Sequence, residues 1–351
     1  MKKVFQFLTI VFCCTVFAGS DYSFYLISDT HFGSLESFGE NPTAKLRRKG
    51  VRAKTAVPLL DAMFKQMAER YGKKNAFLIH TGDVIEGNAF SKEAHIRQFV
   101  EAESMLKKYF NCPVYMVRGN HESVGKYGKA AYFEYIAPAI AKFAGKPEKT
   151  VHYTVKRGDD VFIFVDAYTK GWQNFIYRTL DALEKRPRYL FLVLHPDLLP
   201  HAQKHIVNLC SRLGDFNAVI LSGHTHRTRL LKYTRNGKTT TQFSIGSHLT
   251  APAGKMKYTQ KSTDLNDFLV PFRKLRVKRA SQIELFDREI VPFLSDYVEY
   301  HDGSNRFLAQ GYAVLEVTDS GVTAKIHSGD LSSEPFEIIL LKRNISGENE
   351  K

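Results

Sequence analysis

The chain has 351 residues, of which 44% are hydrophobic and 25% charged, and its formal net charge at pH 7 is +14. Its length allows one large domain or two small ones, and its hydrophobic fraction is ordinary for a folded soluble protein, which excludes a chain too polar to form a core. The basic surface favours anionic substrates or surfaces, but it has no bearing on the fold.

The first 20 residues have the pattern of a secretory signal peptide. Lys2 and Lys3 form a short positive region, residues 4–17 are apolar, and residues 18–20 are a small-residue cleavage site. We expect a mature chain that begins at Asp21, has no transmembrane segment and is exported, to a periplasm or to the medium. An uncleaved anchor is the alternative, but the apolar run is short for a span of about 20 residues.

Polar side chains that can bind metal follow five apolar, β-leaning runs. The first run, Phe24 to Ile27, ends just before Asp29 and His31, which would share a face if the strand continued. Since ligands gather at the carboxyl ends of strands in α/β sheets, five such ends indicate one shared site. The other four runs end at Asp83, at Asn120 with His121 and Glu122, at His195, and at His224 with His226.

Predicted helices alternate with these strands, and hairpins follow towards the C-terminus. Apolar spacing near 3.6 predicts helices over 58–67, 93–110, 130–143, 175–183 and 201–213. Turn residues predict hairpins that join 151–156 to 161–167, 230–234 to 239–244, and 312–317 to 322–326, with 336–341 beside the last. This order predicts an α/β fold, a four-layer α/β/β/α sandwich of two mixed sheets with helices outside.

The sequence divides into a core and a closing part. We expect residues 21–251 to form the core, 252–305 a basic and aromatic insertion or cap without clear alternation, and 306–345 the strands that complete the sandwich.

Two cysteines remain after cleavage, Cys112 and Cys210. Export would permit a disulfide between them, and two buried free thiols are at least as consistent with the sequence.

Taken together, these motifs resemble those of the calcineurin-like metallophosphoesterases. The resemblance covers about residues 22–228, and all of its motif blocks occur in the family's order. It implies the fold given above and a dinuclear metal-dependent phosphoesterase. The matching blocks are Asp29-x-His31, Gly82-Asp83, Gly119-Asn120-His121-Glu122, His195 and Gly223-His224-x-His226.

The resemblance also implies a role for each residue. Imidazole and carboxylate ligands together suit Mn, Fe, Zn or Ni better than a site for magnesium alone. Two such ions, of unknown identity, would clamp the attacking and leaving oxygens, and hydroxide formed from bound water would attack phosphorus in line. By resemblance, Asp83 bridges the ions, Asp29, His31 and His226 complete one metal site, and Asn120, His195 and His224 complete the other.

Two further residues have implied roles outside the ligand set. His121 is the candidate general acid, because an imidazole next to the ligand Asn120 can protonate the leaving oxygen. Glu122 is expected to orient His121 or a ligand. His195 has the least motif support, since a lone histidine after a strand is often structural.

Departures from two subfamilies narrow the expected activity. Protein Ser/Thr phosphatases have Asp-Arg-Gly after the Gly-Asp motif. In this chain the motif is followed by Val84-Ile85-Glu86-Gly87. Purple acid phosphatases have a tyrosine ligand where Glu86 stands, and they lack the histidine supplied here by His31. We therefore expect neither of these activities.

The expected function is hydrolysis of a phosphomonoester or phosphodiester, most simply a small phosphate ester. An exported nuclease and a polyanion-binding protein on the same fold are the alternatives, and the net charge supports both. The basic runs 45–49 and 273–279 are interpreted first as solvated surface, although the first could guide a phosphorylated substrate. The sequence leaves the natural substrate and the oligomeric state open.

Overall fold

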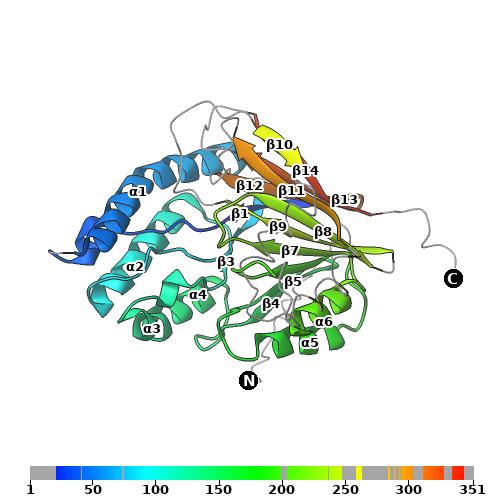
Figure 1. Ribbon diagram of the computed structural model, residues 1–351, viewed down its shortest axis with the longest axis horizontal. Coiled ribbons are helices and arrows are strands. Elements are labelled where there is room, and N and C mark those ends of the chain that lie inside the picture. Colours follow the sequence, from blue (N-terminus) through cyan, green and yellow to red (C-terminus); the bar gives the residue numbers. More distant parts are fainter. Residues whose placement is uncertain are drawn as a thin grey trace, which may run out of the picture.

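The structure is a computed structural model, and the described strands pair into two sheets that pack face to face (Figure 1). It describes residues 21–246 except 41, 73–74, 199–203 and 236, and then 258–262, 284, 288, 292, 294–302, 311–327 and 334–343. The expected signal peptide, the first three residues of the helix predicted over 201–213 and the basic run 273–279 lie outside this part of the chain.

The first sheet has six strands in the order β14-β13-β12-β1-β2-β3. Its β1, β2 and β3 strands run parallel, whereas the C-terminal β12, β13 and β14 are antiparallel to their neighbours. The strands span Tyr22–Ile27 (β1), Asn75–His80 (β2), Val114–Met116 (β3), Tyr312–Thr318 (β12), Gly321–His327 (β13) and Phe336–Lys342 (β14). The predicted closing strands are thus confirmed, and they add directly to β1.

The second sheet has eight strands in the order β10-β11-β8-β9-β7-β6-β5-β4, with β5, β6, β7 and β9 parallel. The predicted hairpins β4–β5 and β8–β9 are both present and antiparallel. Its strands span Tyr153–Arg157 (β4), Asp160–Phe164 (β5), Leu190–Val193 (β6), Ala218–Ser222 (β7), Arg229–Arg235 (β8), Lys238–Ser244 (β9), Tyr258–Ser262 (β10) and Leu294–Asp302 (β11).

The segment 252–305 contributes more regular structure than its sequence indicates. Its described parts include β10 and β11, and β11 pairs with β8, so that both strands extend the edge of the eight-stranded sheet. Val298 on β11 is buried opposite Leu230. Backbone pairing with the edge of the sheet at β8 explains why this segment forms strands although its sequence shows only weak alternation of apolar and polar residues.

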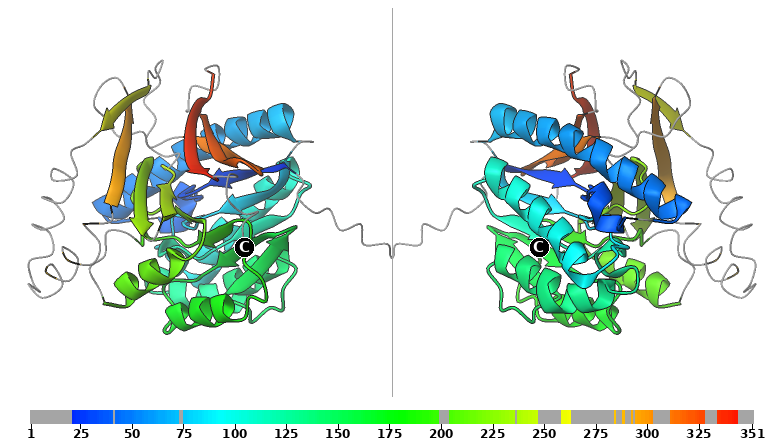
Figure 2. Two further views of the ribbon diagram at one scale, coloured as in Figure 1. Left: turned by 90° about the vertical axis from the view of Figure 1, so that its right-hand side faces the viewer. Right: turned by 90° about the vertical axis from the view of Figure 1, so that its left-hand side faces the viewer.

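Helices cover the outer face of each sheet, and Figure 2 shows α1 and the pair α5 and α6 on opposite sides of the molecule. Helices α1, α2 and α4 pack on the six-stranded sheet, and α5 and α6 pack on the eight-stranded sheet. They span Ala44–Tyr71 (α1), Lys92–Tyr109 (α2), Gly128–Ala131 (α3), Ala137–Phe143 (α4), Trp172–Asp181 (α5) and Lys204–Leu213 (α6), with one-turn elements at Leu35–Phe38 (η1), His121–Ser123 (η2) and Tyr132–Ile136 (η3, a π-helical turn).

Three apolar layers confirm the four-layer sandwich. The layer between the sheets contains stacked aromatic rings, such as Phe162 and Phe191 with centroids 4.4 Å apart. A second layer lies between the six-stranded sheet and α1 and α2, where Leu60 and Phe99 are buried. The third lies beneath α5 and α6. Burial of such side chains is the main term that stabilises the fold.

One local expectation needs correction, and one open alternative is decided. The helix predicted over 58–67 is longer and takes in the basic run 45–49, since α1 begins at Ala44, where Thr43 caps it by accepting a hydrogen bond from the Leu46 N–H. Lysine and arginine are good helix formers, so a run of them does not prevent a helix. Cys112 and Cys210 are free thiols, which excludes the disulfide.

Candidate metal centre

The C-terminal ends of β1, β2, β3, β6 and β7 meet at one edge of the sandwich, as the five strand ends predict. Backbone hydrogen bonds join the loops that follow these strands. The Asp29 N–H donates to Gly82 O at 3.0 Å, and the Gly223 N–H donates to His195 O at 3.0 Å. The loops therefore hold one another in place, and their side chains project into a shared space.

The predicted ligands adopt an unusual backbone conformation. Asp29 and His31 do not continue β1, which ends at Ile27, and both lie in the loop beyond it with φ near +50°. Among described non-glycine residues, φ is positive only at Asn88 and at five predicted ligands, Asp29, His31, Asp83, His224 and His226. Such conformations are strained for side chains with a Cβ and cluster at functional sites.

Glycines in the motifs allow the backbone to approach these ligands closely. A Cβ at Gly119 would collide with the carboxylate of Asp83, and a Cβ at Gly223 would collide with Ser28 and Asp29. The glycines of the Gly-Asn-His and Gly-His-x-His motifs are therefore required by sterics at the site.

The first ligand group comprises Asp29, His31 and His226. The Nε2 atom of His226 lies 3.2 Å from Asp29 Oδ1 and 3.2 Å from His31 Nε2. The other carboxylate oxygen, Asp29 Oδ2, accepts hydrogen bonds from Ser28 Oγ and from the His224 N–H. The carboxylate is thereby oriented with Oδ1 towards the two imidazoles.

The second ligand group comprises Asp83, His195 and His224. His195 Nε2 lies 3.2 Å from Asp83 Oδ2 and 3.2 Å from His224 Nδ1. His195 Nδ1 donates to the carbonyl of Thr81 at 2.8 Å, which leaves its Nε2 as the atom that faces the group. In the sequence His195 is a lone histidine, but in the structure it is completely buried within this cluster.

Asp83 belongs to the second group, and together with His31 and His121 it forms a further group that could hold a metal ion. Its Oδ2 is 3.2 Å from His195 Nε2 and 4.0 Å from His31 Nε2, so that one oxygen faces both groups. Its Oδ1 accepts a hydrogen bond from the His121 N–H at 2.8 Å. This position is compatible with the bridging role that the family resemblance implies for Asp83.

The electrostatics of the cluster favour bound cations. Burial opposes ionisation of Asp29, but a hydrogen bond from His226 and the charge of His195 lower its pKa to about 2. Burial lowers the pKa of His195, whereas the Asp83 and Asp29 carboxylates raise it to about 9. Imidazole nitrogens and ionised carboxylates that converge in this way are the donor set of a transition-metal site.

His121, the expected general acid, lies beside the first ligand group, with its ring 4.5 Å from that of His31. Its Nδ1 donates to the Glu86 carbonyl at 2.6 Å, and its Nε2 is 4.0 Å from Asp83 Oδ2. Burial, assisted by the neighbouring His31, lowers the pKa of His121 to about 4. The ring is therefore neutral near pH 7.

Glu122 contacts backbone rather than the His121 ring. Its carboxylate accepts hydrogen bonds from the N–H groups of Asp83 at 3.1 Å, Val84 at 2.6 Å and Gly119 at 2.6 Å. It thereby ties together the loops after β2 and β3, which present Asp83 and Asn120. Asn120 Oδ1 accepts a hydrogen bond from the Tyr168 hydroxyl at 3.3 Å.

Sequence reasoning missed the role of Glu86, which is completely buried beside the first ligand group. Its Oε2 lies 3.3 Å from His31 Nδ1, and its Oε1 lies 2.6 Å from the ammonium of Lys49 on α1. Lys49 belongs to the basic run interpreted as solvated surface, and this one member of the run instead pairs inwards. A carboxylate three residues after Asp83 was the available signal.

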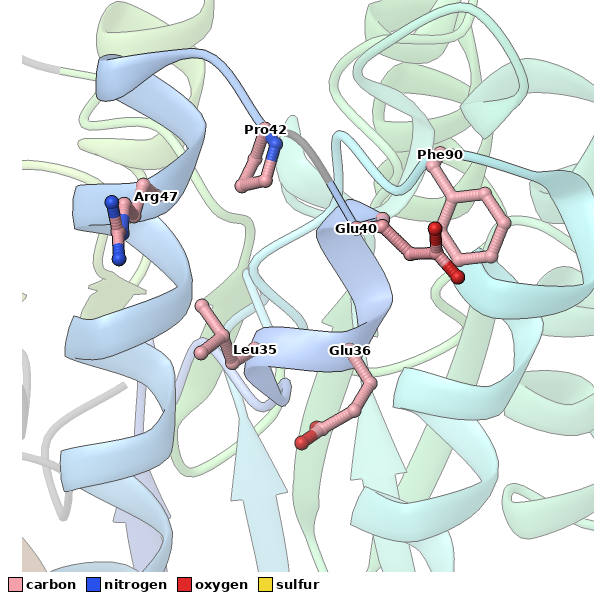
Figure 3. Close-up of a pocket in the computed structure, with 7 residues that line it drawn as sticks. Leu35, Glu36, Glu40, Pro42, Arg47 and Phe90 are labelled. Carbon is pink, nitrogen blue, oxygen red and sulfur yellow. The ribbon is translucent and has the colours of Figure 1, made fainter.

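A cavity of about 890 Å³ lies outside the ligand cluster, between η1, the start of α1 and Phe90 (Figure 3). It is lined by Leu35, Glu36, Gly39, Glu40, Pro42, Arg47 and Phe90. The residues that line the cavity come after β1 or β2 in the sequence, as the predicted ligands Asp29, His31 and Asp83 do. None of the predicted ligands lines the cavity.

Comparison with known proteins decides the family. A model of the calcineurin-like phosphoesterase family matches residues 22–228, more than half of the chain. The chain belongs to this family. It is a metal-dependent phosphoric ester hydrolase of a family that uses a dinuclear metal centre.

Of three similar solved structures, one supports the fold. A dimetal phosphatase from Danio rerio is 12% identical, with a TM-score of 0.54 over 91% of this chain and 99% of that chain. GAP50 of Plasmodium, described as the anchor in the inner membrane complex, is 13% identical over 92% and 90% of the two chains, with a TM-score of 0.48. A Pseudomonas putida nuclease is 14% identical over 66% and 80%, with a TM-score of 0.26. No curated protein matches the chain.

Among the residues that the structure describes, no helix combines the length and the apolar composition needed to cross a bilayer.

Proposed function

We propose that the calcineurin-like phosphoesterase hydrolyses small phosphomonoesters or phosphodiesters outside the cytoplasm, with two transition-metal ions in the cluster described above. The observation that carries this proposal is the position of Asp83 Oδ2, which faces both ligand groups at once. Asp29, His31 and His226 would hold one ion and Asn120, His195 and His224 the other, with Asp83 shared. Manganese, iron, zinc and nickel all suit this donor set.

The bound ions would supply Lewis acidity and lower the pKa of water. The protein's own residues do the rest. The Thr81 carbonyl fixes the ring orientation of His195, a Glu86 carboxylate oxygen lies 3.3 Å from His31 Nδ1, and the Glu122 carboxylate fixes the backbone that presents Asp83. A phosphate held next to His121 would raise the pKa of that imidazole, so that Nε2 could give a proton to the leaving oxygen.

The experiment that tests the proposal compares two substrates on the manganese-loaded protein. Initial rates are measured on a nitrophenyl phosphate monoester and on the matching diester, with Asp83→Asn as the inactive variant. Asp159→Asn is the matched control, because Asp159 pairs with Lys185 on the surface away from the cluster. Metal-dependent turnover of either ester that Asp83→Asn abolishes supports the proposal. No turnover with two metals bound would favour a binding protein instead.

The nuclease alternative depends on the net charge of +14. Lys49 would add little to the attraction of a nucleic acid, since its ammonium is paired with the buried Glu86 carboxylate. Affinity for single-stranded DNA that falls steeply with salt would favour the nuclease, because phosphate contacts release counterions.

A further inference from the structure

Tyr168 lies beside the second ligand group although no motif includes it. It follows β5 in the loop that leads to α5, and its hydroxyl is 3.3 Å from Asn120 Oδ1. Its ring centroid is 6.2 Å from that of His195. The residue is 39% exposed, so that part of it is open to a substrate while its hydroxyl reaches a predicted ligand.

A buried carboxylate fixes the position of the Tyr168 loop. Asp166 Oδ1 accepts the Tyr168 N–H at 2.9 Å, and Asp166 Oδ2 accepts the Thr169 hydroxyl at 2.8 Å and the Tyr132 hydroxyl at 3.1 Å. Asp166 is only 1% exposed. A loop held by several hydrogen bonds to one buried side chain presents Tyr168 in a defined place.

Arg118 connects this loop to the loop that carries Asn120. Its guanidinium forms an ion pair with Asp166 at 3.4 Å and lies 4.2 Å from the Tyr132 ring and 5.6 Å from the Tyr168 ring. The arginine is two residues before Asn120 in the chain. The phenol and the ligand amide are thus positioned against each other by one charged cluster.

We propose that Tyr168 is a substrate-contacting residue, whose hydroxyl donates a hydrogen bond to a phosphoryl oxygen and whose exposed ring borders the leaving group. The inference rests on the proposed function. A phenol is a neutral donor, and a phosphoryl oxygen beside Asn120 is a stronger, charged acceptor than the amide.

The alternative is that Tyr168 only positions Asn120. The two roles differ in what is lost when the hydroxyl is removed. A substrate contact affects the affinity for phosphate and leaves the affinity for metal unchanged, whereas a positioning role affects the affinity for metal. Tyr168→Phe removes the hydroxyl and keeps the ring that packs near Arg118. Tyr135→Phe is the control, since the Tyr135 hydroxyl donates to Glu103 away from the cluster.

The test measures three quantities on the full chain. These are manganese binding, binding of inorganic phosphate to the manganese-loaded protein, and kcat and KM for the ester that the wild type hydrolyses better. We expect Tyr168→Phe to bind manganese as the wild type does, to bind phosphate about tenfold more weakly and to raise KM by a similar factor, as loss of one hydrogen bond to a charged group implies. Tyr135→Phe should match the wild type throughout.

Two results would overturn the inference. One is unchanged phosphate affinity in Tyr168→Phe; the other is weaker manganese binding with normal phosphate affinity at saturating manganese, which would make Tyr168 a positioning residue. Absence of turnover in the wild type would instead contradict the proposed function. Phosphate binding would then still decide the role of Tyr168.

Discussion

The ammonium of Lys49 lies 2.6 Å from Glu86 Oε1, and the second oxygen of that carboxylate lies 3.3 Å from His31 Nδ1. The pair links α1 to the first ligand group across 37 residues of sequence. A carboxylate behind a metal-binding histidine fixes the orientation of its ring and increases its basicity. Lys49 in turn balances the charge of a carboxylate that is completely buried.

We therefore predict that Lys49→Met weakens manganese binding about tenfold, since loss of such an outer partner typically costs between 10- and 100-fold in affinity. Titration calorimetry on the metal-free protein measures this directly. Lys45→Met, which changes an exposed lysine one turn earlier in α1, should have no effect. Equal metal affinity in both variants would show that the pair is structural.

Asp83→Asn should remove most bound metal and reduce turnover by roughly a thousandfold or more, because the shared carboxylate serves both groups and metal activation is worth several kcal/mol. Metal content by elemental analysis and initial rates check the two effects separately. Asp159→Asn should retain both. A fully metallated, active Asp83→Asn enzyme would refute the shared position of Asp83.

The contrast between Asp83 and Lys49 shows what the sequence can and cannot predict. Asp83 belongs to a motif whose residue types are dictated by local sterics. The position next to the Asp83 carboxylate must be a glycine, because Gly119 leaves no room there for a Cβ. The strand order and the hairpins follow from equally local patterns of apolar and turn residues. Lys49 pairs with Glu86 only through the packing of α1, and no local pattern encodes that contact.

The same limit applies to β11 and to Tyr168. β11 is positioned by antiparallel pairing with β8, a strand that is distant from it in sequence. Tyr168 reaches Asn120 because Asp166 and Arg118 fix two separate loops. Non-local contacts of this kind depend on the complete fold, and a motif scan does not register them.

His121→Ala should keep its metal and reduce turnover by about 100-fold or more for esters with poor leaving groups. Its ring contacts the cluster through Nε2, 4.0 Å from Asp83 Oδ2, without belonging to the expected ligand set. The measurement is a series of aryl phosphates with leaving groups of increasing pKa. Equal slowing across the series would argue against an acid role.

Export is a prediction from residues 1–20, and it can be tested by expressing the full chain in a bacterial host. We expect the periplasmic or secreted product to begin at Asp21, as determined by N-terminal sequencing and intact mass. Replacing Leu8 with Arg interrupts the apolar region and should leave the precursor in the cytoplasm. A full-length product in the membrane fraction would favour the uncleaved anchor.

His327 gives a pH dependence of stability that is independent of the metal centre. It is only 2% exposed at the end of β13, where its ring stacks on Tyr312 and its Nε2 accepts a hydrogen bond from the Tyr71 hydroxyl at 2.9 Å. Burial, followed by the charges of Arg70 and Lys325, lowers its pKa to about 4.

In the unfolded chain the pKa of His327 is about 6.5, so between pH 6.5 and pH 4 the unfolded state binds more protons than the folded state. The stabilising effect of a neutral His327 is therefore complete above pH 6.5 and is lost as the pH falls towards 4. We expect wild type to lose about 1–3 kcal/mol more than His327→Gln over this interval. Urea unfolding at pH 7.5 and pH 4.5 measures the difference, and equal losses in the two proteins would show that His327 does not titrate between these states.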